Sequence, residues 1–240
     1  MDADDLFNPQ MLEKAYTKAI QTDADMVVFR SDQFRDDLQE FLPAKWTLRI
    51  EELPPYRPMD FRTFTDNVFK VFVGWAWDKL FKHTFVIEQG LRFQELRTSN
   101  DMLFVFTAIV TAKRIEVIDE VLAHQRRDNP ESLSNTREKS WDCFHSALNA
   151  LKVNLIQRGL YEELEQDYIN YCLHFSLWNL YTIKGEKKEV LFNKLKKEWF
   201  QEFGISDKGS KFFYNNNEYK KYLLIMNSNY IVWNQLIAKE

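Results

Sequence analysis

Two short apolar runs, many of their residues β-branched, lie among helical patterns in the first half of the chain. The run at 26–29, "MVVF", follows an amphipathic segment for which Asn8 is a suitable N-cap. The run at 115–123, "IEVIDEVLA", follows a helical pattern with Asn100 as N-cap and Asp101 in its first turn. Helices that alternate with buried strands indicate an α/β fold.

The pattern changes after about residue 131. Residues 31–60 contain most of the prolines and are expected to be irregular. "VFVGWAWDKLFKHTFV" indicates a strand or turn that leads into a short helix. After that change the chain is helical, with helices ended by Gly159 and Gly204 and a partly helical tail. We therefore expect an α/β part at 1–131 and an all-helical part at 132–240.

Charge and cysteine content narrow the class of protein. The net charge of −4 provides no basic field to attract phosphates, so nucleic acid is not expected as a partner. Cys143 and Cys172 form no metal or redox motif and fit reduced thiols in a cytosolic protein. No signal peptide or membrane-spanning apolar run is visible. The lysine-rich segment 184–199 is interpreted as a solvated helix face, with membrane-surface or polymer binding as the alternative.

Three carboxylates, Asp2, Asp4 and Asp5, crowd the beginning of the sequence. Carboxylates at this spacing on a loop can share a divalent cation such as Mg²⁺ or Mn²⁺, together with phosphate oxygens. The alternative is that Asp4 and Asp5 only complement the positive end of the following helix. From these residues alone the helix interpretation is slightly favoured, because Asp-x-Asp is a short motif.

A second group of candidate residues lies in "GWAWDKLF" and at the start of the helix near residue 100. Asp101 could act as a general base that takes the proton of an attacking hydroxyl, or it could simply cap its helix. Trp75 and Trp77 could present their flat faces to a sugar ring, although core packing is the better interpretation of these rings taken alone.

Arginines follow the second apolar run. Arg126, Arg127 and Arg137 could neutralise a leaving diphosphate. A solvated turn with an N-cap at Ser134 or Asn135 explains the same stretch equally well. The four histidines show no metal-ligand spacing, and nothing indicates a Ser-His-Asp or Cys-His nucleophile system.

The order of these segments carries more information than any one of them. "DADDLFNPQMLEKAY", "ADMVVFRSDQF", "WAWDKLFKHTFV", "SNDMLFVFTAIVTAKRIEVIDEVLAHQRR" and "SLS" occur in this succession. Over roughly residues 1–135, that succession resembles the latter part of a family 2 glycosyltransferase of the GT-A fold. The helical remainder is similar to a C-terminal extension of some bacterial members.

The resemblance implies roles for individual residues. Asp2 and Asp4 match the loop that binds the metal and the nucleotide sugar, with Asp4 as the direct ligand and Mn²⁺ or Mg²⁺ as the expected cofactor. Asp101 matches the general base of inverting members. Trp77 and Lys79, with Trp75 beside them, match the segment that lines the acceptor side.

The sequence departs from the family pattern in three places. Asn100 replaces the first acid of the usual Glu-Asp pair, and Asp78 stands where Asn is common. The family's donor-binding strands precede the Asp-x-Asp loop, so about three elements, roughly 90 residues, are expected ahead of Met1 and are missing here.

The predicted function follows from the resemblance. The intact enzyme would transfer a sugar, with inversion, from a nucleotide-diphosphate sugar to a glycan or lipid-linked acceptor, as in polysaccharide biosynthesis. It would work in the cytoplasm, with peripheral association at the inner face of the membrane as a second location. The alternative is a non-catalytic binding module or an inactive remnant of such an enzyme. The donor sugar, the acceptor and the oligomeric state are not indicated by the sequence.

Overall fold

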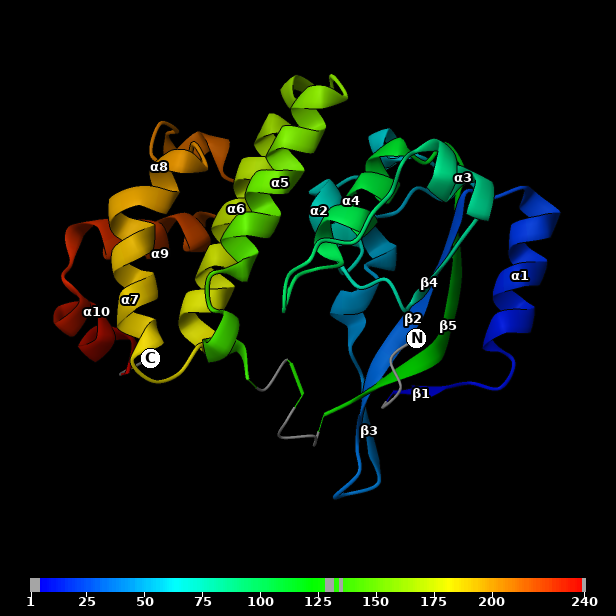
Figure 1. The fold of residues 1–240 in the computed structure, drawn as a ribbon, viewed down its shortest axis with the longest axis horizontal. Helices are drawn as coiled ribbons and strands as arrows, with labels where there is room; N and C mark the ends of the chain where they lie inside the picture. The colour runs from blue at the N-terminus through cyan, green and yellow to red at the C-terminus, as the bar shows by residue number, and fades with distance from the viewer. Residues whose placement is uncertain (1–4, 128–131, 134–135, 239–240) are drawn as a thin grey trace. The chain divides into compact units, whose positions relative to one another are not determined.

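The computed structural model describes residues 5–127, 132–133 and 136–238. The chain forms two compact units, Met1–Asn135 and Thr136–Glu240, and each is described by itself (Figure 1). The first unit is a mixed α/β layer structure and the second is helical, so the predicted fold class is confirmed. The assignment of the first part as a partial GT-A domain remains a prediction.

A five-stranded sheet forms the centre of the first unit. Its strands are β1 (Leu6–Phe7), β2 (Met26–Arg35), β3 (Glu40–Leu42), β4 (Lys79–Phe81) and β5 (Ile115–Arg126). They lie in the order β1-β5-β2-β3, and β4 pairs with the first residues of β2. The central pair β2–β5 is parallel, whereas β1, β3 and β4 run antiparallel to their neighbours.

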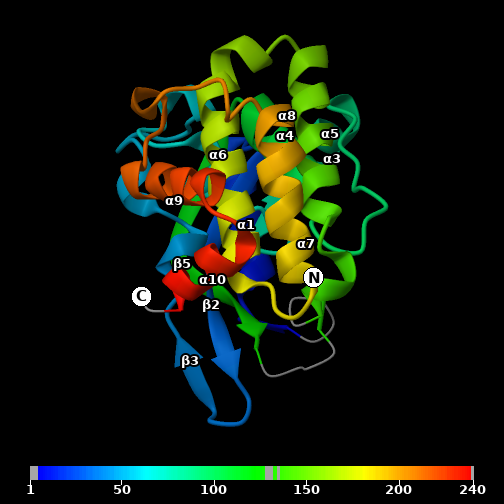
Figure 2. The ribbon, with the colours of Figure 1, turned by 90° about the vertical axis from the view of Figure 1, so that its left-hand side faces the viewer.

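Strand β2 is longer than the sequence predicts. It continues to Arg35 and turns into β3, so that the first part of the stretch expected to be irregular is a hairpin (Figure 2). The expectation was wrong there because β5 also continues, and its pairing of His124 with Asp32 supplies backbone partners beyond the apolar run. The rest of that stretch contains the short 3₁₀ turns Lys45–Thr47 and Ile50–Glu52, with Phe61–Thr63 just after it.

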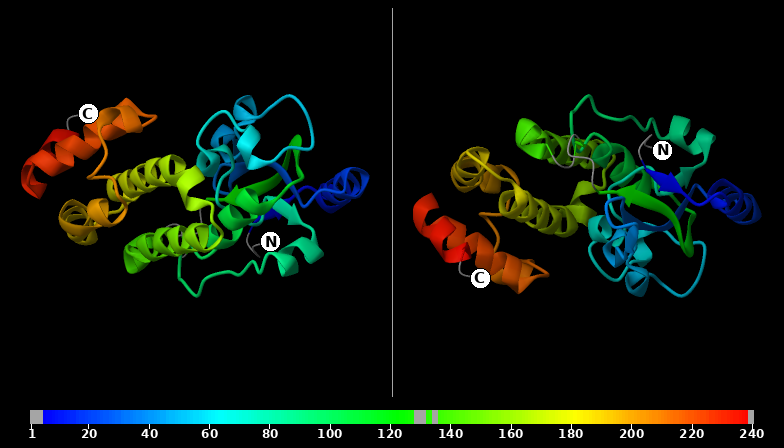
Figure 3. Two further views of the ribbon diagram at one scale, coloured as in Figure 1. Left: turned by 90° about the horizontal axis from the view of Figure 1, so that it is seen from above. Right: turned by 90° about the horizontal axis from the view of Figure 1, so that it is seen from below.

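Helices cover both faces of the sheet (Figures 1 and 3). They are α1 (Met11–Thr22), α2 (Val68–Val71), α3 (His83–Glu88) and α4 (Met102–Thr111). Helix α1 lies on one face, where Met11 and Ala15 pack with Phe29 of β2 and Leu122 of β5. The buried helix α4 lies on the other face.

The second unit contains the predicted helices. They are α5 (Cys143–Gln157), α6 (Tyr161–Thr182), α7 (Lys187–Lys194), α8 (Phe200–Glu202), α9 (Asn216–Asn227) and α10 (Tyr230–Ile237), with a π-helical turn at Leu195–Trp199 between α7 and α8. Gly159 and Gly204, the predicted helix stops, have φ of +68° and +78°, a left-handed conformation that glycine adopts without strain. Trp141, expected within the long helix, instead precedes α5 and stacks on Trp199.

Candidate functional site

Polar side chains gather where the parallel strands β2 and β5 end. His124 Nδ1 lies 2.5 Å from Asp32 Oδ1 across the two strands. The ring of Phe41, from the hairpin strand β3, lies with its centroid 4.7 Å from that of His124. Because ligands of open α/β sheets bind outside the carboxyl ends of parallel strands, we refer to this place as the carboxyl edge and take it as the candidate site.

The acidic segment before β1 reaches the same edge. Asp5 Oδ1 accepts a hydrogen bond of 2.9 Å from the backbone N–H of Arg126, the last residue of β5. This bond joins Asp5 to the end of β5, six residues ahead of the first residue of α1. The hydrogen bond next to the start of α1 comes from Asn8, whose Oδ1 accepts the N–H of Gln10 at 2.9 Å. Asp2 and Asp4, the predicted metal ligands, lie outside the described residues.

The two predicted diphosphate-side arginines lie along strand β2. Arg126 forms an ion pair with Asp36, and its guanidinium carbon lies 5.8 Å from the centroid of the Phe34 ring. Arg127 donates to Gln33 Oε1 at 3.0 Å. Both guanidinium groups are therefore fixed near the carboxyl edge by contacts with the β2–β3 hairpin.

Arg137 belongs to the second unit. Its guanidinium lies over the ring of Trp178, 4.1 Å from the centroid, and it donates to Thr182 Oγ1 at 2.8 Å. Burial lowers the pKa of this guanidinium. Ser134 and Asn135, the alternative N-caps, lie outside the described residues.

Three tryptophans from two segments form a cluster beside β1. Trp75 and Trp77 stack with centroids 4.8 Å apart and an interplanar angle of 21°. The rings of Trp46 and Trp75 form a T-shaped pair with centroids 5.1 Å apart, and 47% of Trp46 is exposed. Trp77 contacts Phe7 of β1 at 6.4 Å and packs on the core beneath α1. Trp77 therefore belongs partly to the core, whereas the side of the cluster formed by Trp46 is open to solvent.

The segment that carries two of these rings is held by a buried lysine. Lys79 Nζ donates to the carbonyl oxygens of Val73 at 2.8 Å and Trp75 at 2.7 Å. It also donates to Asp78 Oδ1 at 2.5 Å, and neither side chain of this ion pair is exposed. Lys79, predicted to lie on the acceptor side, therefore binds the loop from within, and its acceptor role remains a prediction.

Asp78 lies in an unusual environment for a carboxylate. Burial raises its pKa to about 6, against the opposing charge of Lys79. Its second oxygen, Oδ2, has no hydrogen-bond partner among the described residues. A buried carboxylate with one unsatisfied oxygen costs stability, so the ion pair is not explained by stability alone.

Asp101 occupies the N-cap position of α4, and its carbonyl oxygen accepts the N–H of Val105 at 2.9 Å. Its carboxylate makes no capping hydrogen bond with the first turn of α4, so the capping alternative is not what the structure shows. Helix α4 is next to the tryptophan segment, since a Cβ on Gly74 would lie 3.2 Å from Cζ of Phe106, one turn beyond Asp101. The role of Asp101 as a base remains a prediction.

Sequence reasoning did not identify Trp46, Asp32 or His124 as site residues. Trp46 lies in a stretch expected to be irregular, and its position depends on Thr47, whose hydroxyl donates to Ser31 O of β2 at 3.0 Å. Asp32 and His124 come together through the extension of β2 beyond its apolar run, for which there is no local sequence signal.

No metal cluster is visible in the ranges that the structure describes, since no three His, Cys, Asp or Glu side chains there are placed to hold an ion. His145 and His174 each lie 2.6 Å from a glutamate oxygen, of Glu202 and Glu218. Cys143 and Cys172 are free thiols.

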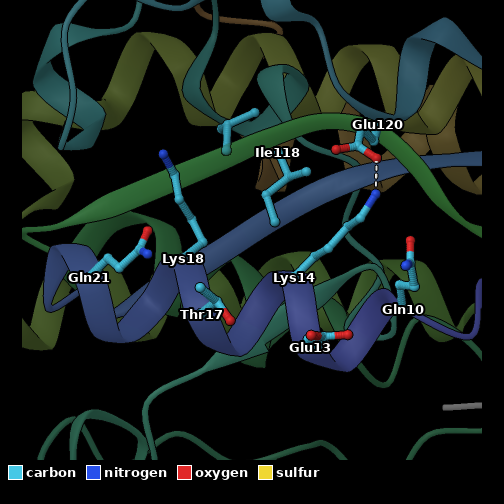
Figure 4. Close-up of a pocket in the computed structure, with 9 residues that line it drawn as sticks. Gln10, Glu13, Lys14, Thr17, Lys18, Gln21, Ile118 and Glu120 are labelled. Carbon is cyan, nitrogen blue, oxygen red and sulfur yellow. Dashed lines mark hydrogen bonds and ion pairs between the residues drawn. The ribbon is translucent and has the colours of Figure 1, made fainter.

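A shallow pocket of about 490 Å³ lies between α1 and β5 (Figure 4). Lys14 and Lys18 extend across it and pair with Glu120 and Glu116 of β5. None of the predicted site residues lines this pocket, and its internal ion pairs satisfy the charges that a ligand would need.

Comparisons with known proteins bear on the fold and the class of enzyme. No protein-family model matches the chain. The chain is 24% identical over 232 residues to a cholesterol galactosyltransferase of Borreliella burgdorferi, and the match covers 92% of this chain and 63% of that protein. The chain thus spans less than two thirds of the length of this curated relative.

Two crystal structures of S. aureus TarS 1–349 resemble the chain in fold. The complex with UDP-GlcNAc has a TM-score of 0.59 at 16% identity, over 88% of this chain and 57% of that one. The complex with UDP has a TM-score of 0.54 at 16% identity, over 82% and 53%. By weak sequence similarity and by fold, the chain is glycosyltransferase-like.

Proposed function

We propose that the chain is the acceptor-side part of a family 2-like, inverting glycosyltransferase that uses a nucleotide-diphosphate sugar. One observation carries the proposal: Asp5 is bonded to the end of β5, and Phe7, two residues later, contacts Trp77. Asp5, assigned to the donor side, is therefore connected through Phe7 to Trp77, assigned to the acceptor side. The galactosyltransferase relative and the TarS complexes with UDP and UDP-GlcNAc support a nucleotide-sugar donor.

The donor set of the acidic segment suits a hard cation. Asp2 and Asp4 would provide carboxylate oxygens, and Asp5, which follows them in the sequence, is fixed to β5 by the Arg126 N–H. A bound Mn²⁺ or Mg²⁺ would supply neutralising charge for the diphosphate. Arg126 and Arg127, which the hairpin holds at the carboxyl edge, would add positive charge on the leaving-group side.

The proposed reaction is a single displacement. The acceptor hydroxyl oxygen forms a bond to the anomeric carbon while the bond from that carbon to the diphosphate oxygen breaks, and the electron pair leaves with the diphosphate. Asp101 takes the hydroxyl proton during the attack. Attack from the face opposite the leaving group inverts the anomeric configuration.

The tryptophan cluster would position the acceptor. Trp46 is half exposed, and Trp75 beside it is held by the hydrogen bond from Lys79 to its carbonyl oxygen. Flat aromatic surfaces bind the apolar face of a sugar ring, or of a ring system in a lipid-linked acceptor, at little conformational cost. Trp46→Ala should raise the KM for the acceptor and leave the KM for the donor unchanged. Tyr56→Ala, at another exposed aromatic residue of the same stretch, is the matched control.

A transfer assay with radiolabelled UDP-galactose and UDP-GlcNAc tests the proposal. The chain is assayed in the presence of Mn²⁺ and an extract of glycan and lipid acceptors. Asp101→Asn should lower kcat by about 10²- to 10⁴-fold, since it removes the base. Transfer at the wild-type rate by this variant would exclude Asp101 as the base. A chain that transfers no sugar from any nucleotide donor would favour the non-catalytic alternative.

A further inference from the structure

The C-terminal helix α10 carries large apolar side chains on both of its faces. On the inner face Trp233 is fully buried, with ring contacts to Phe192 of α7 at 5.1 Å and Tyr181 of α6 at 5.5 Å. On the outer face Ile231 is 67% exposed, Val232 45% and Leu236 43%. The same face also carries the exposed polar residues Asn234 and Gln235, and three large exposed apolar side chains on one short helix make it a candidate contact surface.

Val232 and Leu236 form an apolar pair on this face, and the exposed Gln235 lies between them and Ile231. Val232 and Leu236 are four residues apart and adjacent on the helix surface, and Ile231 lies about 100° from Val232. Helix α10 is fixed in place by its buried Trp233 and by Asn229, whose Oδ1 accepts the N–H of Val232 at 3.0 Å. The outer face is therefore presented by an ordered, capped helix.

Three lysines contact residues that hold this helix in place. Lys188 Nζ lies 5.5 Å from the centroid of the Trp233 ring, on the residue that anchors α10. Lys196 Nζ donates to Ser228 O at 2.5 Å, at the junction of α9 and α10. Lys221 Nζ lies 4.7 Å from the centroid of the Tyr181 ring, which itself contacts Trp233. Each of these ammonium groups contacts α10 itself, Ser228 just ahead of it in the chain, or a residue that packs on Trp233.

Positively charged residues outnumber acidic ones in the same region of the sequence. Residues 184–238 contain ten lysines and six acidic residues, whereas the whole chain carries a net charge of −4. The partner that complements exposed apolar residues within a lysine-rich region is a surface with negative charge outside and hydrocarbon beneath. An anionic lipid bilayer has this arrangement, and surface helices that bind it combine exposed Leu, Ile or Trp with lysines.

We infer that the outer face of α10, together with Lys188, Lys196 and Lys221, is a contact surface for an anionic lipid bilayer. The contact is peripheral: in the described part of the chain, no helix is long and apolar enough to cross a membrane. The inference does not depend on the proposed transferase reaction, so each can fail without the other. It would bring the chain to the surface where a lipid-linked acceptor is found.

Co-sedimentation with vesicles tests this surface. The probes are vesicles of phosphatidylcholine and phosphatidylglycerol at 3:1, and of phosphatidylcholine alone. The wild type should bind the anionic vesicles, lose most of this binding at 0.5 M salt, and bind neutral vesicles at least tenfold more weakly. Equal binding to both kinds of vesicle, or binding to neither, would overturn the inference.

Variants locate the contact. Ile231→Asp with Leu236→Asp should lower binding by more than tenfold, and Lys188→Gln with Lys221→Gln by roughly 25-fold, about fivefold for each lysine. Val153→Asp, at a residue of α5 that is 53% exposed, is the matched control and should bind as the wild type does. Circular dichroism and thermal unfolding confirm that each variant is folded. Loss of binding in the control but not in the α10 variant would contradict the assignment.

A second copy of the chain is the competing occupant of this face. Sedimentation equilibrium from micromolar to hundred-micromolar protein distinguishes it from a lipid surface. A wild-type dimer that the Ile231→Asp, Leu236→Asp variant dissociates, without vesicle binding, would assign the face to self-association and overturn the lipid assignment. A monomer that binds anionic vesicles supports it.

Discussion

Lys79 and Asp78 are neighbours in the sequence and form an ion pair, Nζ to Oδ1 2.5 Å, in which neither side chain is exposed. Lys79 also binds the carbonyl oxygens of Val73 and Trp75, so the pair lies beneath the loop that carries Trp75 and Trp77. A charged pair without exposure is weak evidence for stability and better evidence for a fixed geometry. Its consequences can be measured without knowledge of the ligand.

Removing the lysine should be costly. Lys79→Met leaves the Asp78 carboxylate buried without its ion-pair partner and releases two carbonyl oxygens, so the free energy of unfolding should fall by about 3–5 kcal/mol. Urea unfolding followed by tryptophan fluorescence measures the change. The matched control is Lys82→Met, which breaks the exposed ion pair with Asp23 and should leave stability close to that of the wild type. Equal effects of the two changes would contradict the burial of Lys79.

The raised pKa of Asp78 predicts a pH dependence. The folded-state pKa of about 6 lies above the ordinary value of 3.8, because burial favours the neutral acid. The folded state therefore binds this proton more tightly, and the resulting stability is complete below about pH 3.8 and lost as the pH rises through 6. At about 1.4 kcal/mol for each pKa unit, the loss amounts to about 3 kcal/mol.

Asp78→Asn isolates this contribution, since the amide does not titrate. The free energy of unfolding is measured in urea at pH 4 and pH 7. The wild type should lose stability relative to the variant between these two pH values. A difference that is the same at both pH values would show that Asp78 does not titrate in this range.

Gly74 should not tolerate a larger residue. A Cβ there would lie 3.2 Å from Cζ of Phe106, a fully buried ring that also packs edge-on against Phe69. We expect Gly74→Ala to cost about 1–2 kcal/mol of stability through overpacking. Gly209→Ala, where a Cβ meets no atom within 4 Å, should be neutral or slightly stabilising. Placing Gly74→Ala on a Phe106→Leu background should remove most of its effect.

The two thiols should differ in reactivity. Cys172 is fully buried, and burial raises its pKa well above the ordinary range, whereas Cys143 is half-buried. Because the thiolate is the reactive form, Ellman's reagent should titrate one thiol rapidly in the folded protein and the second only after unfolding. Cys143→Ser should abolish the fast phase. A fast phase that survives in this variant would place Cys172 at the surface.

The strands and helices that could be predicted are those with a strong local pattern. The apolar core of β2, the strand β5, and the helices α4, α6 and α7 follow from periodicity and helix stops that the folded chain keeps. The extension of β2 to Arg35 could not be predicted, because it depends on pairing with residues about 90 positions later in the sequence. The same pairing brings Asp32 to His124.

The candidate site was predictable only in part. Asp5 and Trp77 were identified from local sequence; Asp5 binds the end of β5, and Phe7, two residues later, contacts Trp77. Trp46 was missed because it reaches the cluster through a turn fixed by Thr47 and Ser31, a tertiary contact with no sequence signal. The burial of Lys79 was equally invisible, since a lysine between two aromatic segments is usually exposed.

The central claim is that a nucleotide sugar is handled at the carboxyl edge, with Asp4 as a metal ligand. Its most direct test is Mn²⁺-dependent release of UDP from UDP-galactose or UDP-GlcNAc by the chain. We predict release that requires Mn²⁺ or Mg²⁺, is lost in Asp4→Ala, and is unchanged in Glu51→Gln, an exposed control. Release that is indifferent both to the metal and to Asp4→Ala would contradict the account.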